Sequence, residues 1–167
     1  ACGWEWRAKN SQDEGPKVAL IADEDIVGCL VNGIASLAGW ATEWAGTTGD
    51  ATLLVGLYAP EEYPMSLWQY RAMFAERLHG AQDLASTAGP VMTTVTLDSL
   101  RSSADDLLAI TRLVAHDLES AFGVFGPPQI SGEGQLRWRY FYRDKHDWLR
   151  KWAEAWGITV IDDENTD

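Results

Sequence analysis

The chain has 167 residues, a formal net charge of −12 and a hydrophobic fraction of 46%. This length and composition are typical of one globular domain with a substantial core, and they exclude a disordered chain. The negative charge argues against broad nucleic-acid binding, because phosphates require a cationic surface. We expect residues 1–167 to form a single domain with an acidic tail at 162–167. The start at Ala1, without Met, suggests a domain excised from a longer protein.

Cysteine usage and hydropathy favour a cytoplasmic protein. Cys2 and Cys29 form neither a CxxC pair nor a disulfide framework, which fits a reducing compartment. The longest apolar stretch without a charge, Ile26–Ala41, is interrupted by Asn32 and Ser36 and is short for a bilayer span. We therefore expect a cytoplasmic location and no membrane partner.

Hydrophobic periodicity predicts strands and helices in alternation along the chain. The expected strands carry alternating or continuous apolar residues between turn residues: Cys2–Lys9, Ala51–Ala59, Val91–Asp98, Leu136–Arg143 and Ile158–Ile161. The expected helices begin at or near capping residues and end before or near glycines: Asp25–Ala45, Ser66–His79, Ser102–Phe122 and Asp144–Trp156.

The fold class follows from the strand patterns. Alternation of strands and helices invites a parallel α/β sheet. However, Val91–Asp98 and Leu136–Arg143 alternate apolar and polar residues, which indicates that only one face of each strand is covered. We therefore predict a two-layer α+β fold with helices packed on one face of a mixed β-sheet. A three-layer α/β fold is the alternative.

The segment Leu136–Gly157 is unusually basic and aromatic, and it holds four of the nine Trp residues. Between Arg137 and Lys151 the net charge is +4, so the remainder of the chain sums to −16. Arg and aromatic residues are enriched at interface hot spots. We expect a binding surface formed by Arg137, Arg139, Phe141, Arg143 and Lys145. In the last helix, Trp148, Trp152 and Trp156 recur every four residues, so we expect them to form one buried stripe.

Patterns typical of catalysis are weak. The pairs His116-Asp117 and His146-Asp147 are of the kind that HD-type metal phosphohydrolases use, but they lie on different expected helices and leave only His79 as a third histidine. The chain has no Walker A, dinucleotide-binding or nucleophile-elbow motif. We predict no catalytic residue, no metal site and no cofactor.

One short segment has a family resemblance. Gly46–Leu57, with the sequence GTTGDATLLVGL, is similar to the Asn-Thr-x-Gly-Gly-x-Leu-Leu-Ile-Gly-Val pattern of Schlafen-type AlbA-2 domains. The match covers about a dozen residues. The resemblance implies nucleotide or nucleic-acid binding.

The sequence favours a non-catalytic protein-interaction or regulatory domain that acts through its C-terminal strand and helix. We expect a protein partner, with self-association into a homodimer, because the +4 segment complements the −16 remainder. Three alternatives stay open: the nucleotide- or nucleic-acid-binding role, a hydrolase with an acidic and histidine-lined cleft, and an acidic phosphate mimic that occupies a DNA-binding partner.

Overall fold

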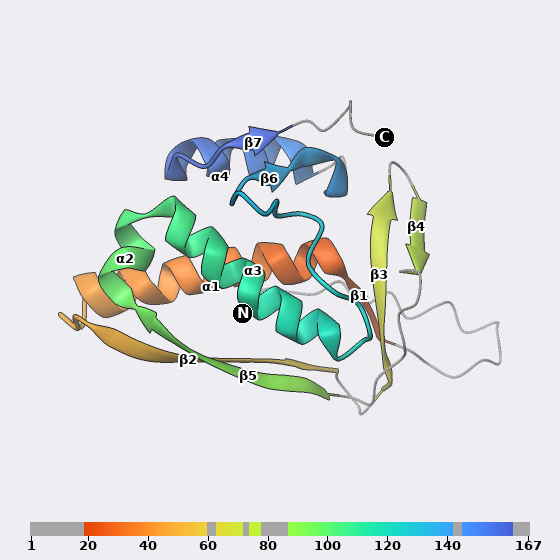
Figure 1. Ribbon diagram of the computed structural model, residues 1–167, viewed down its shortest axis with the longest axis horizontal. Coiled ribbons are helices and arrows are strands. Elements are labelled where there is room, and N and C mark those ends of the chain that lie inside the picture. The colour runs from red at the N-terminus through yellow and green to blue at the C-terminus, as the bar shows by residue number, and fades with distance from the viewer. Residues whose placement is uncertain (1–18, 60–62, 72–73, 78–86, 142–144, 162–167) are drawn as a thin grey trace.

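A computed structural model of the chain describes residues 19–59, 63–71, 74–77, 87–141 and 145–161 (Figure 1). These residues form an α+β fold, so the predicted class is confirmed. The strands are β1 Ala19–Ala22, β2 Asp50–Tyr58, β3 Met65–Arg71, β4 Phe74–Arg77, β5 Thr87–Thr96, β6 Leu136–Arg137 and β7 Val160–Ile161. The helices are α1 Asp23–Glu43, α2 Leu97–Ser102, α3 Ala104–Ser120 and α4 His146–Trp156, with a short 3-10 helix η2 at Trp138–Tyr140.

The described strands divide among three small sheets. One sheet has the order β1-β3-β4, with β1 parallel to β3 and β3 antiparallel to β4. A second sheet is the antiparallel β2–β5 ribbon, and a third is the short parallel pair β6–β7. In Figure 1, α1 and α3 occupy the centre, with the β2–β5 ribbon on one side and α4 with β6 and β7 on the other.

Helix α1 begins directly after β1 and is the central helix of the core. Its first turn carries Asp23, Glu24 and Asp25, where the helix dipole stabilises negative charge. Its buried apolar residues then recur at helical spacing: Ile26, Val27, Leu30, Val31, Ile34, Ala35 and Ala38. Among the described residues, α1 is also the one helix long and apolar enough, by length and composition alone, to cross a membrane, a property that core helices share.

Helix α3 packs against α1 and supplies much of the remaining core. Its N-cap is Ser103, one residue beyond the predicted Ser102, and the Ser103 hydroxyl accepts a hydrogen bond from the Asp106 amide at 3.1 Å. Its buried stripe contains Leu107, Leu108, Val114, Ala115 and Leu118, and Phe122 continues it beyond the helix end. The predicted helix is therefore confirmed, with its start shifted by one or two residues.

The predicted helix Ser66–His79 is wrong. The described part of this segment forms β3 and β4, and β3 pairs in parallel with β1. This pairing buries Met65, Ser66 and Leu67 in the core. The Ser66 and Gln69 capping pattern is short enough to arise by chance, and the long-range pairing with β1 overrides it. The predicted strand Cys2–Lys9 lies outside the described residues.

The C-terminal segment also departs from prediction. The expected strand Leu136–Arg143 is a strand only at Leu136–Arg137, because the chain turns through η2 and places Trp138 on His146, with ring centroids 4.3 Å apart. The expected buried Trp stripe of α4 is wrong as well. The helix buries Leu149 and Ala153, whereas the Trp148 side chain is 47% exposed.

The three α4 tryptophans instead form a ladder along one side of the helix. Ring centroids lie 6.3 Å apart between Trp148 and Trp152, and 6.2 Å apart between Trp152 and Trp156. Trp152 and Trp156 are half-buried against the core. Helix α4 ends as predicted at Gly157, which has φ 66° and accordingly occupies the left-handed region that glycine tolerates.

We therefore predict that α4 is held mainly by Leu149 and little by Trp148. Leu149→Ala should lower the free energy of unfolding by roughly 2–5 kcal/mol, the usual cost of removing a buried Leu side chain. Trp148→Ala should cost about 1 kcal/mol or less, because half of its surface stays in water in the folded state. Urea unfolding followed by circular dichroism measures both, and a larger loss for Trp148→Ala would contradict this assignment.

Candidate functional site

The structure does not place the predicted binding residues on one exposed face. Of the four that it describes, Arg139 is exposed, Arg137 and Lys145 are half-buried, and Phe141 is buried in the core. Arg143 lies outside the described residues. An extended strand would place Phe141 on the same face as Arg137 and Arg139, but the turn at η2 removes that alternation. The segment nevertheless carries a cationic and aromatic surface, formed in part by other residues.

We call this surface the C-terminal basic–aromatic surface, and it consists of Trp138, Arg139, Tyr140, Trp148, Arg150 and Lys151. The Arg139 guanidinium donates a hydrogen bond to the Tyr140 hydroxyl at 2.7 Å and lies 4.8 Å from that ring centroid. Arg150 lies 5.4 Å from the Trp138 ring centroid, within cation–π range. Arg150 and Lys151 are exposed and form no ion pair with the residues that the structure describes.

A second polar group is buried where α1, α3 and the loop after α3 meet. We call it the buried acidic cluster; its members are Asp23, Glu119 and Gln129, all of which are excluded from solvent. The Glu24 amide donates to Asp23 Oδ1 at 2.7 Å. Neither carboxylate oxygen of Glu119 has a hydrogen-bond partner among the described residues. Sequence spacing could not reveal this cluster, because its members come from three distant segments.

Burial decides the protonation of the cluster. Desolvation raises the pKa of Asp23 to about 7, although the Gln129 side chain and the Glu24 amide lower it. Desolvation likewise raises the pKa of Glu119 to about 8, and the negative charge of Asp23 raises it further. The folded protein therefore favours protonated carboxyls at these two positions below neutral pH.

The neighbouring carboxylates on α1 are neutralised by an ion pair instead. Lys145 Nζ lies 2.7 Å from Glu24 Oε1 and also contacts Asp25 Oδ1. Burial lowers the pKa of Lys145, but hydrogen bonds and charges from Asp25 and Glu24 outweigh that effect and raise it. Lys145 is thus a structural cation that attaches the C-terminal segment to the first turn of α1.

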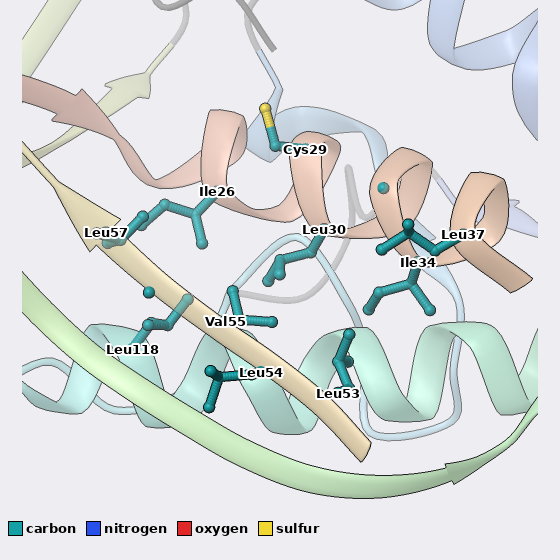
Figure 2. A pocket seen from close by; sticks show the side chains of 12 residues that line it. Ile26, Cys29, Leu30, Ile34, Leu37, Leu53, Leu54, Val55, Leu57 and Leu118 are labelled. Carbon is teal, nitrogen blue, oxygen red and sulfur yellow. The ribbon is translucent and has the colours of Figure 1, made fainter. Parts of the chain in front are cut away.

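An apolar groove lies between α1 and β2 and has a volume of about 300 Å³. Figure 2 shows α1 side chains on one side of it and β2 side chains on the other. Ile26, Leu30 and Ile34 of α1 and Leu118 of α3 belong to the buried core, so the core opens to the surface at this groove. Leu53 and Val55 of β2 are only half-buried there.

The described histidines do not converge with the acidic cluster. His116 lies beside Phe125, with ring centroids 6.2 Å apart, whereas His146 stacks on Trp138. Within the described ranges, no three His, Cys, Asp or Glu side chains are grouped so that they could hold a metal ion. His79 lies outside the described residues.

Comparison with protein-family models, with curated proteins and with solved structures gives no match to this chain. The segment that resembles AlbA-2 domains forms the turn after α1 and most of β2. Its nucleotide- or nucleic-acid-binding implication stays a hypothesis.

The buried acidic cluster predicts that stability falls as pH rises. Both folded pKa values lie above the ordinary values near 4, so between about pH 4 and pH 8 the unfolded chain releases protons that the folded chain retains. Glu119→Gln removes one of these groups. The variant should match the wild type near pH 4 and exceed its free energy of unfolding by roughly 2–4 kcal/mol at pH 8.

Chemical unfolding across pH 4–9 measures this effect. Glu133→Gln, at an exposed position, is the matched control and should leave the pH profile unchanged. A Glu119→Gln variant that is less stable than the wild type at pH 8 would contradict the assigned shift.

Proposed function

We propose that this chain is a non-catalytic protein-interaction domain, cytoplasmic and self-associating, which binds an acidic protein surface through the C-terminal basic–aromatic surface. The observation that supports the proposal best is the exposure of Arg150 and Lys151 without an ion-pair partner among the described residues, in a chain of net charge −12. Because acidic residues outnumber basic ones in this chain, most basic side chains have a carboxylate within reach. Two basic side chains that point to solvent instead are therefore available to an anionic group on another molecule.

Aromatic contacts make this surface suitable for binding. The Arg150 guanidinium lies over Trp138, which itself stacks on His146, so the side chain is held in place before a partner arrives. Preorganisation of this kind reduces the entropy lost on association. The half-exposed Trp148 ring lies three residues before Lys151 on α4, so it adds apolar area beside that cation, a combination that is enriched at interface hot spots.

The burial of the acidic cluster favours binding over catalysis. A general acid or base must come within hydrogen-bond distance of its substrate. Asp23 and Glu119 have pKa values suited to proton transfer near neutral pH, but their side chains are enclosed by the core. The hydrolase alternative would require this closed cluster to open, and the interaction role does not.

The proposal can be tested with an octaglutamate peptide as the acidic probe. We expect the indole N–H resonances of Trp138 and Trp148 to shift on titration at low salt and to return toward their free positions at about 0.5 M salt, because exposed charges are then screened. Arg139→Glu combined with Arg150→Glu should weaken peptide binding by about tenfold or more. Arg112→Glu, an exposed charge reversal on α3, is the matched control and should bind as the wild type does.

Two outcomes would overturn the proposal. One is the absence of any salt-sensitive shift with octaglutamate. The other is stronger binding of an oligothymidylate of equal length at the same tryptophans, which would favour the nucleic-acid alternative because base stacking on aromatic rings is typical of such sites.

A further inference from the structure

We infer that the apolar groove between α1 and β2 is the interface for a second copy of this chain, in which β2 of each copy pairs antiparallel with β2 of the other. The inference rests on the proposed self-association, but it assigns that association to a surface separate from the C-terminal basic–aromatic surface.

Strand β2 has an available edge. It is nine residues long and pairs only with β5 among the described strands, so its other edge carries no described partner strand. Natural edge strands are usually protected by charged residues, by proline or by short length. After Asp50 at its start, β2 contains neither a charge nor a proline. An unprotected edge of this length is suited to pairing with another strand.

The core is incompletely covered beside that edge. Leu53 and Val55 lie on the face of β2 that packs toward the core, yet both remain half-exposed. Across the groove, Ile26, Leu30 and Ile34 are buried, and Leu37 continues their row out to solvent (Figure 2). Contiguous exposed apolar surface of this kind marks an interaction site.

The absence of charge around the groove allows a second copy to be its occupant. The chain carries −12, so two copies repel each other wherever their charged surfaces meet. Three segments around the groove contain no charged residue: Ile26–Thr42 of α1, Ala51–Tyr58 of β2 and Thr87–Thr96 of β5. Charged residues stand at their ends, among them Glu43 at the end of α1 and Asp50 at the start of β2. Two copies can therefore meet here without placing like charges together. Two identical antiparallel strands are self-complementary about a two-fold axis, so the contact closes as a dimer.

The rim of the groove supplies anchoring side chains. Leu37 lines the groove, and Trp40 on α1 and Trp44 at its C-cap follow Leu37 at helical spacing; the two tryptophans are 62% and 82% exposed. Exposed Trp side chains at the edge of an apolar groove are typical hot-spot residues. Leu54 and Met92, which face each other across β2 and β5, extend the exposed apolar area on the outer face of the ribbon.

The test is the oligomeric state of the full chain, measured by light scattering over a range of concentrations. The wild type should be a dimer. Leu37→Glu combined with Trp40→Glu should raise the dimer dissociation constant by at least about a hundredfold, because four buried charges would enter an apolar interface. Phe125→Glu replaces an apolar side chain that is 77% exposed elsewhere on the surface, and it should remain dimeric.

A second measurement tests the pairing itself. In a chain with Cys2→Ser and Cys29→Ser, mild oxidation should link two copies through Leu54→Cys on β2 but not through Thr94→Cys on β5. Both positions are exposed on the ribbon, so exposure alone does not separate them. Linking through Thr94→Cys alone would overturn β2 pairing.

The failure of this inference and that of the proposed function are distinguishable. Arg139→Glu with Arg150→Glu should leave the dimer intact, because those residues lie outside the groove. A wild type that is monomeric at every concentration would overturn the inference whether or not it binds octaglutamate. A dimer that dissociates with the Arg variants and survives the Leu37 and Trp40 changes would overturn it as well.

Discussion

Three consecutive carboxylates at the start of α1 set the constraint on which the rest of the structure depends. They stand where a strand passes directly into the central helix, so Asp23 and Glu24 are carried into the core. A buried charge is costly unless it is paired or neutralised. The fold uses both solutions. Glu24 and Asp25 form ion pairs with Lys145. Asp23 lies beside Glu119 and Gln129, where burial favours its protonated form.

This constraint joins the first turn of α1 to the C-terminal segment. Lys145 is held at the first turn of α1, and next to it in the chain His146 stacks on Trp138, over which Arg150 lies. The last turn of α1 pairs with Arg101 of α2 through Glu43, and between Ile26 and Thr42 the helix carries no charged residue. There the helix presents an apolar face beside β2, and the core opens as a groove. One helix thus has a charged end that holds the C-terminal segment and an uncharged side that lines the groove.

The parts of the fold that the sequence predicts well are long periodic segments. In helices α1 and α3 and in strand β2, apolar residues recur over many positions, and a repeat of that length rarely arises by chance. The wrong helix at Ser66–His79 rested on two capping residues, and pairing of β3 with β1 overrode them. The Lys145–Glu24 ion pair joins residues about 120 positions apart, and no local spacing encodes such a contact. The binding-site prediction included Phe141, which the structure buries, and omitted Trp138 and Arg150, which are in cation–π contact in the same segment.

The central claim is that the Lys145–Glu24 pair holds the C-terminal segment to α1, and a double-mutant cycle tests it most directly. Free energies of unfolding would be measured for Lys145→Met, Glu24→Gln and the double variant at pH 7. Lys145→Met alone should cost roughly 3–5 kcal/mol, because it removes the cation that faces a buried carboxylate. The double variant should be more stable than the sum of the single effects by about 1–3 kcal/mol. Single effects that add to within about 0.5 kcal/mol would show that the two residues are not coupled and would contradict the account.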